Sequence, residues 1–212
     1  MNELGKSLTD TLNTSDLQNV TNELLETNID SLLKNGVLKD IPIINSIVGI
    51  YKLGVSIKDI IFMKKLIRFL SEINDTSIQE RQKVIAKMEK DDKYGRKVGE
   101  TILTLLDRLD DLNKANIVGI LFKALMKGRF DTFVFQRLCH SIDKVFIDDI
   151  QELRAYIRGQ YIDNDIKSSL YISGLLNRTM FGNITVDGNN EYEVNDLGII
   201  LIRELDAEKV VV

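Results

Sequence analysis

Apolar residues recur every three or four positions along most of the chain, which is the pattern of helices that bury one face. A capping box at residues 15–18 opens a helix to about Glu26. Helical spacing continues through residues 25–33 and stops at Gly36, the residue type that often terminates a helix. The first seventy residues are therefore predicted to be helical.

The middle of the chain continues this pattern. A capping box at residues 77–80 opens a helix through about Asp91. The next helix is predicted to be long, from about Tyr94 to Lys127, and residues 113–116 offer a place for a break. Gly128 is then a suitable stop.

The last third of the chain combines helical patterns with β-strand patterns. Asp131 can cap a helix through Val145, and helices are predicted over residues 147–157 and 166–177. The turn Asp187–Asn190 lies between two β-rich runs, which is a strong hairpin signal. A helix over residues 197–205 closes the chain.

Residues 170–205 resemble the second half of a winged-helix domain. The matching features are Gly174-Leu175-Leu176 at a helix end, the hairpin, and residues 192–198 leading into the last helix. The expected fold class is therefore mainly α. We expect an N-terminal helical bundle over residues 1–143, followed by a small winged-helix-like α+β part over residues 144–212.

The winged-helix resemblance implies either DNA binding or docking to another protein. The helix that would read DNA, within residues 166–178, offers only Lys167 and Arg178 as bases. Residues 144–212 carry twelve acids against seven bases. Because phosphate neutralisation drives most DNA affinity, this charge favours docking to a partner protein, with DNA binding by residues 166–178 as the alternative.

Composition sets wider bounds. The 212 residues are 44% hydrophobic and 28% charged, so the chain can bury a substantial core. With a net charge of −4, the surface as a whole is not expected to attract nucleic acid or anionic lipid. One cysteine and no signal-peptide pattern at the N-terminus favour a reducing cytoplasm.

Candidate chemistry is sparse. His140 beside Cys139 does not supply the three or four ligands of a zinc site, and a packed helix residue is the simpler interpretation. Asp107, Asp110 and Asp111 form an acidic cluster, but Asp110 and Lys114 make an ordinary i,i+4 pair on a helix face. No enzyme activity, catalytic residue, metal or cofactor is therefore predicted.

An apolar stretch from Ile41 to Ile57 contains a single charged residue, Lys52. Asp40 can cap a helix here, and Pro42 is tolerated in a first helical turn. Seventeen helical residues would span ~26 Å, slightly less than a hydrocarbon core of ~30 Å. Inserting Lys52 would cost about 2.5–3.5 kcal/mol. A permanent membrane span is therefore not expected.

Residues 58–70 are apolar and basic at once, the composition of a helix at a membrane surface. Two alternatives stay open for residues 41–70: a buried helical hairpin, or a segment that meets lipid conditionally. The membrane-contact candidates are Ile41, Ile43, Ile44, Ile47, Val48, Ile50, Tyr51, Leu53 and Val55. The candidates for a basic face, which would meet lipid headgroups or a nucleotide or oligonucleotide ligand, are Lys58, Lys64, Lys65 and Arg68.

Charge also differs between neighbouring segments. Residues 1–40 carry seven acids and three bases, whereas residues 41–70 carry one acid and five bases. Opposite charges attract, so we expect the acidic N-terminal helices to cover the basic stretch in the resting state, as a latch.

Three runs, at residues 37–42, 57–66 and 98–111, resemble a widespread family of bacterial helical proteins. The resemblance covers about residues 30–150. It implies an effector or accessory role in phage-defence operons, with channel-type effectors such as that of the Hailong system among the similar proteins. It carries over no catalytic residue.

The expected function is a non-enzymatic effector that forms homo-oligomers and associates conditionally with a membrane, or forms a pore in it, in phage defence. It would reside in the bacterial cytoplasm, or associate with the inner membrane. The alternative is a soluble winged-helix module that regulates through a protein or DNA partner.

Overall fold

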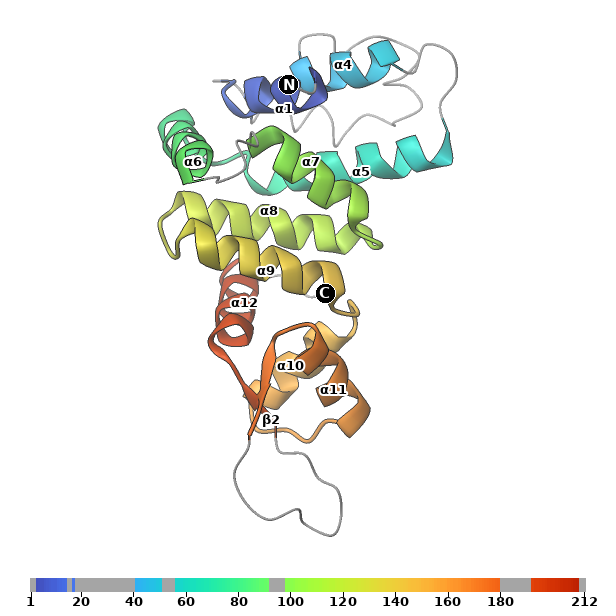
Figure 1. The fold of residues 1–212 in the computed structure, drawn as a ribbon, viewed down its shortest axis with the longest axis vertical. Coiled ribbons are helices and arrows are strands. Elements are labelled where there is room, and N and C mark those ends of the chain that lie inside the picture. Colours follow the sequence, from blue (N-terminus) through green and yellow to red (C-terminus); the bar gives the residue numbers. More distant parts are fainter. Residues whose placement is uncertain are drawn as a thin grey trace. The chain divides into compact units, whose positions relative to one another are not determined.

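The computed structural model describes residues 3–14, 17, 41–50, 56–91, 98–179 and 192–209. Ten helices and one two-stranded antiparallel sheet occur in these ranges (Figure 1). The prediction of a mainly α fold is confirmed. The chain divides into two compact units, residues 1–132 and residues 133–212.

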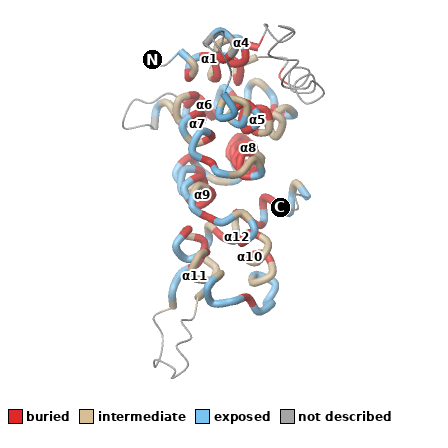
Figure 2. Tube along the Cα trace, turned by 90° about the vertical axis from the view of Figure 1, so that its right-hand side faces the viewer, coloured by how far each residue is buried: buried red, intermediate tan, exposed pale blue. Residues whose placement is uncertain are grey.

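The described helices of the first unit are α1 (Glu3–Leu12), α4 (Pro42–Ile50), α5 (Ile57–Glu72), α6 (Ile78–Asp91), α7 (Val98–Arg108) and α8 (Leu112–Met126). α5 and α8 make the most extensive contact, and α1 packs against α4 and α7. α8 is the central element, since nearly every residue from Lys114 to Met126 is buried. Figure 2 shows α8 almost entirely in the buried colour.

Gly119 explains how closely α5 and α8 approach. A Cβ atom at Gly119 would lie 2.9 Å from the carbonyl oxygen of Phe69 and 2.7 Å from Cβ of Glu72. Only glycine permits that backbone separation. The rings of Phe69 and Phe122 fill the same interface with their centroids 5.6 Å apart, and both are fully buried.

Local sequence signals set several helix ends. The predicted capping box at residues 77–80 is confirmed: the Ser77 hydroxyl accepts from Glu80 N, and the Glu80 carboxylate accepts from Ser77 N. A second capping box, which we did not predict, joins Ser56 and Asp59 and begins α5. This box sets the N-terminal end of α5.

The predicted long helix from Tyr94 to Lys127 is wrong in one respect. The structure has two helices, α7 and α8, and the break falls at residues 109–111 rather than 113–116. Asp111 causes it, because its carboxylate accepts from Asn113 N at 2.6 Å and begins α8. α8 ends as predicted, with Gly128 at a φ of 70°.

The second unit contains α9 (Thr132–Lys144), α10 (Asp149–Ile157), α11 (Asn164–Ile172), β1 (Leu176–Arg178), β2 (Tyr192–Val194) and α12 (Asp196–Ala207). α9 begins directly after Asp131, as its predicted capping role requires. β1 and β2 pair antiparallel, with Leu176 opposite Val194 and Arg178 opposite Tyr192.

The helix predicted over residues 166–177 is too long at its C-terminal end. Gly174 adopts a φ of 80°, so the chain leaves α11 there and enters β1. The final helix is confirmed, and the Asn195 side chain caps it by accepting from Gly198 N at 3.0 Å.

Some predictions fall on positions outside the described residues. These are the capping box formed by Ser15 and Gln18, the helix end at Gly36, the cap at Asp40, the start near Tyr94, and the hairpin turn with the strand before it at residues 180–190.

Candidate functional site

α4 is the most apolar described helix of the first unit. Its sequence, PIINSIVGI, has no charged side chain. Ile43, Ile44 and Ile47, together with Ile41 just before the helix, are buried. Among the described elements α4 packs chiefly against α1, so α1 is its main cover.

For the other membrane-contact candidates, the structure describes no side chain. Nothing is described for the side chains of Val48 and Ile50, or for Tyr51, Leu53 and Val55. Within the described residues, no helix combines the length and the apolar character that crossing a membrane requires.

Two hydroxyl contacts join α1 to α4. The Thr11 hydroxyl accepts from the backbone N–H of Ile43 at 3.0 Å. The hydroxyls of Ser7 and Ser46 lie 2.6 Å apart. Both contacts are at least partly shielded from water, and Thr11 is fully buried. The cover over α4 therefore combines apolar packing with hydrogen bonds and includes no ion pair among the described residues.

α1 also meets α7 at a crossing of two glycines. A Cβ atom at Gly99 would lie 2.0 Å from the carbonyl oxygen of Gly5. A Cβ atom at Gly5 would lie 2.3 Å from Cγ of Glu100. Such distances are far inside van der Waals contact, so this crossing needs glycine on both helices. It fixes where α1 lies and hence where it covers α4.

Arg81 ties the C-terminal end of α1 to the turn between α5 and α6. Its guanidinium is buried and donates to the carbonyl oxygens of Leu12 (2.7 Å), Thr14 (2.6 Å) and Thr76. Burial lowers the pKa of Arg81, and the nearby Glu80 carboxylate opposes this effect. The carbonyls at the end of α1 carry partial negative charge, which favours a cation there.

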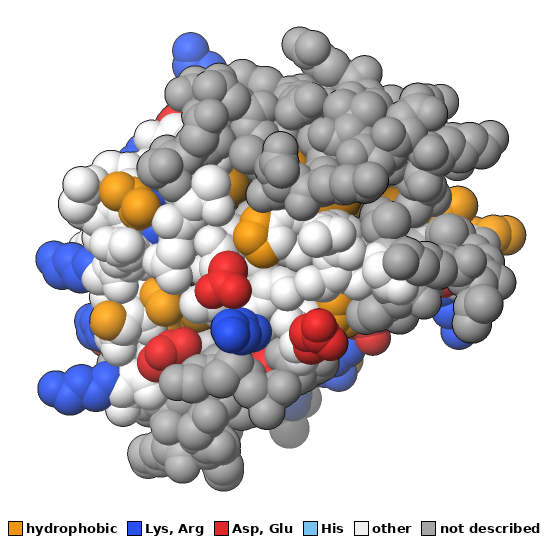
Figure 3. Space-filling model, turned by 90° about the horizontal axis from the view of Figure 1, so that it is seen from above, with side chains coloured by type: hydrophobic (Ala, Val, Ile, Leu, Met, Phe, Trp, Pro, Cys, Tyr) orange, Lys and Arg blue, Asp and Glu red, His pale blue; other side chains and the backbone are white. Residues whose placement is uncertain are grey.

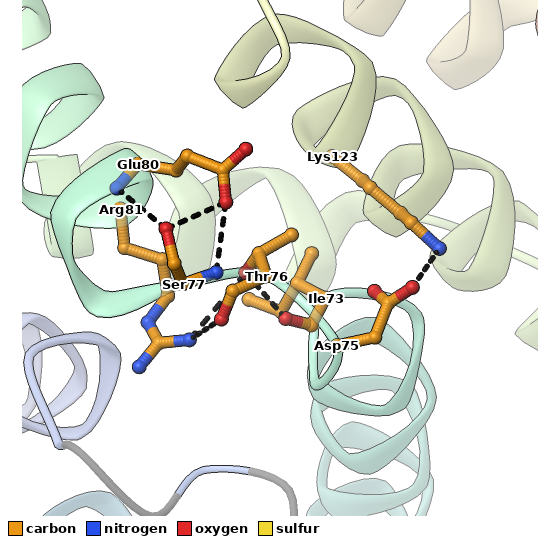
Figure 4. Close-up of polar contacts among 7 residues, drawn as sticks. All are labelled: Ile73, Asp75, Thr76, Ser77, Glu80, Arg81 and Lys123. Atoms are coloured by element: carbon orange, nitrogen blue, oxygen red, sulfur yellow. Dashed lines mark hydrogen bonds and ion pairs between the residues drawn. The ribbon is translucent and has the colours of Figure 1, made fainter.

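The turn between α5 and α6 collects further polar contacts, drawn in Figure 4. Lys123 of α8 is nearly buried, and its ammonium lies 2.9 Å from Asp75 Oδ2. The Thr76 hydroxyl donates to the carbonyl of Ile73 at 2.6 Å. This turn therefore connects α1, α5, α6 and α8 within the first unit.

The four basic candidates do not share one face. Lys58 and Lys64 are exposed. Lys65 is buried and donates to the carbonyls of Asp107 and Leu109 at the end of α7. Arg68 donates to Asn113 at 2.9 Å and Asn116 at 3.2 Å. Two of the four side chains thus stabilise the connection between α7 and α8. On the face of the molecule that Figure 3 shows, both basic and acidic side chains are present.

The acidic cluster also has structural partners. Asp110 forms the predicted pair with Lys114, with the two charged atoms 2.7 Å apart. The hydrogen bond from Lys114 lowers the pKa of Asp110. Asp111 caps α8, as described above. Among the described residues, no group of histidine, cysteine and carboxylate side chains could hold a metal ion.

Cys139 and His140 lie in α9 without forming a site. Burial strongly raises the pKa of the Cys139 thiol, so the nucleophilic thiolate is disfavoured. His140 is exposed on the helix surface rather than packed as predicted.

Comparisons with protein-family models, with curated proteins and with solved structures find no match to the chain.

Thr11 and Arg81 were not predicted as functional residues, although both carry a recognisable signal in the sequence. Arg81 precedes Val84, Ile85 and Met88 at helical spacing, so it occupies the apolar stripe of α6. Thr11 likewise lies on the buried face of α1. A polar side chain in the apolar register of a helix is a candidate for a buried contact.

Proposed function

We propose that the chain is a non-enzymatic oligomeric effector of phage defence that meets a membrane only after α1 leaves α4. The observation that carries the proposal is the cover itself. Among the described elements, a helix without charged residues packs chiefly against one short helix, and the described hydrogen bonds between the two helices are made by hydroxyl groups.

The energetics favour a triggered device. Exposing Ile43, Ile44 and Ile47 to water would cost about 1.5–3 kcal/mol for each side chain. A free energy of that size keeps the uncovered state rare unless lipid or a partner compensates. Lipid provides such compensation, because it is as apolar as the protein core.

The latch that we propose differs in kind from the ionic latch expected from charge. α1 contacts α4 through Ser7 and Thr11, and both leucines on the buried face of α1 are shielded from water. Opposite charges of residues 1–40 and 41–70 would add long-range attraction to this contact. The short-range contact is therefore expected to depend little on salt.

Dye release from anionic liposomes tests the proposal. Deleting residues 1–26 is expected to raise release above that of the intact chain. Leu8→Ser, which places a hydroxyl on the buried face of α1, is expected to do the same within the full chain. Lys6→Ser, on the exposed face of the same helix, is the matched control and should leave release unchanged.

A disulfide across the cover supplies the reverse experiment. Ser7→Cys and Ser46→Cys would bring two thiols together where the hydroxyls lie 2.6 Å apart. Combined with Leu8→Ser and Cys139→Ser, the oxidised protein should stop releasing dye, and a reductant should restore release. The proposal would be contradicted if the deletion variant and Leu8→Ser both released no more dye than the intact chain.

A second candidate function concerns the second unit, for which we propose a winged-helix-like docking module. The order α10, α11, β1, β2, α12 and the antiparallel pairing of the strands support it. Its net negative charge favours a protein partner over DNA. A DNA-binding regulator would instead be favoured if the protein is retained on DNA in a salt-dependent manner and if Lys167→Ala and Arg178→Ala abolish that retention.

A further inference from the structure

Four of the six tyrosines of the chain are described in the second unit, and contacts connect them around α11. Together with two α11 side chains they form a surface that we name the tyrosine face. Its members are Tyr156, Tyr161, Lys167, Ser168, Tyr171 and Tyr192.

Hydrogen bonds and ring contacts hold these side chains in place. The Tyr156 hydroxyl donates to the backbone carbonyl of Tyr192. The Tyr192 hydroxyl lies 3.3 Å from that of Ser168, and its ring centroid is 5.6 Å from that of Tyr171. A surface fixed in this way loses little conformational freedom when a partner binds, which favours affinity.

The tyrosine face leaves apolar area open to solvent. Tyr161 is 79% exposed and Tyr171 is 44% exposed. Ile172, which lies one helical turn after Ser168 in α11, is 77% exposed. Fixed tyrosine rings and a neighbouring aliphatic side chain are the composition of energetically important positions in protein interfaces.

The charge of the face indicates which partner fits. The Lys167 ammonium lies 5.4 Å from the ring centroid of Tyr156 and 5.2 Å from that of Tyr161. It is half-buried, and no carboxylate of the described residues forms an ion pair with it. The two aromatic rings hold this ammonium at the surface, where it is positioned for an anion from a partner.

The strand pair adds to this positive character. Arg178 lies directly opposite Tyr192, so the two side chains leave the same face of the sheet. Glu193 follows Tyr192 in β2 and points to the other face. The side of the sheet that bears Tyr192 thus presents a base, and the acid lies on the opposite side.

We infer that the tyrosine face docks an acidic segment of a partner protein. A carboxylate of that segment would pair with Lys167, and an aromatic or aliphatic side chain beside it would pack on Tyr161, Tyr171 and Ile172. Residues 133–212 carry thirteen acids and eight bases. This net negative charge repels a nucleic acid, which carries a phosphate on every nucleotide, more than it repels a short acidic peptide. This inference is independent of whether α4 meets lipid.

Fluorescence anisotropy with three labelled probes tests the inference on the full chain. The probes are a short glutamate-rich peptide that contains phenylalanine, its counterpart with lysine in place of glutamate, and single-stranded oligothymidylate. We expect binding of the acidic peptide only. Lys167→Glu should weaken that binding about five- to tenfold, because it replaces attraction by repulsion next to aromatic rings.

Two further variants complete the design. Tyr161→Ala should also weaken binding, and because Tyr161 is largely exposed, folding should persist. Lys144→Glu makes the same charge change at an exposed position of α9 outside the tyrosine face, and should bind as the wild type does. No binding of the acidic peptide, equal loss with Lys144→Glu, or preferred binding of oligothymidylate would each overturn the inference.

Discussion

The backbone N–H of Ile43 donates to the hydroxyl of Thr11, 3.0 Å away, so a side chain of α1 caps the first turn of α4. Caps usually come from the residue just before a helix. Here the cap comes from a residue 32 positions earlier. The start of α4 therefore depends on α1 being in place, which couples the cover and the covered helix.

Thr11→Val keeps the shape of the side chain and removes the acceptor. We expect it to lower the free energy of unfolding by about 1–2 kcal/mol, because a buried N–H loses its partner. Urea denaturation measures the change. Thr9→Val is the control, since among the described residues the Thr9 hydroxyl bonds within α1, to the Gly5 carbonyl. Equal losses in the two variants would argue against a cap by Thr11.

A Gly→Ala substitution is expected to have opposite effects on stability at Gly99, in the crossing of α1 and α7, and at Gly49, in α4. Gly99→Ala should destabilise the first unit by about 1–3 kcal/mol or more, because the new methyl group meets the Gly5 carbonyl. The Cβ atom of Gly49→Ala, in α4, would meet no atom of the described residues within 4 Å. This substitution should stabilise by about 0.5–1 kcal/mol through helix propensity. Thermal unfolding of both variants gives the signs, and a neutral Gly99→Ala would contradict the close crossing.

Arg81→Met should lower the free energy of unfolding by about 2–4 kcal/mol, since it leaves buried carbonyls without donors. Arg81→Lys should restore only part of the loss, because an ammonium cannot reproduce the planar array of donors. Lys83→Met, at an exposed position of α6, is the control and should change stability by less than about 0.5 kcal/mol. Full rescue by lysine would show that charge alone matters at this position.

Glu80 predicts a pH dependence of stability. Hydrogen bonds from the Ser77 hydroxyl and backbone N–H lower the pKa of Glu80 below its ordinary value of 4.5. The ionised form is thus favoured by folding, and its contribution is complete above pH 4.5. It is lost as the pH falls through the lower pKa of the folded state.

Urea denaturation across the acid range checks this effect. The stability difference between wild type and Glu80→Gln should be greatest near neutrality and should shrink as the pH falls. Glu3→Gln, also in a first helical turn, controls for general charge effects. A difference that grows on acidification would reverse the assigned sign.

Cys139 is expected to resist alkylation in the folded protein, because it is buried and burial raises the pKa of its thiol. Iodoacetamide labelling followed by mass spectrometry should show modification only after denaturation. A comparison protein with Gln136→Cys and Cys139→Ser places a thiol on the exposed surface of α9 and should react at once. Rapid labelling of native Cys139 would show that the second unit opens readily.

Sequence patterns predicted the elements whose causes are local. The box at Ser77 and Glu80, the stop at Gly128 and the last helix each depend on residues within a few positions of one another. The same local reasoning placed the break between α7 and α8 too late, because both Asp111 and the following asparagines suit a turn.

Contacts that join distant parts of the chain were beyond such reasoning. Arg81 donates to a carbonyl 69 positions away, and Lys65 donates to one 44 positions away. The composition of residues 58–70 made Lys65 a candidate for a basic face. A lysine among apolar residues gives the same sequence pattern whether its ammonium faces solvent or donates to the carbonyls at the end of another helix. Only the packing of α5 against the end of α7 distinguishes the two.

The acceptors of Arg81 at Leu12 and Thr14 belong to the main chain. Any amino acid at those two positions would present the same oxygen atoms, so the side chains there are free to diverge without weakening this connection. Selection on this connection then falls on Arg81, and one missense change there would remove these hydrogen bonds, whereas substitutions at their two acceptor positions would keep the oxygen atoms.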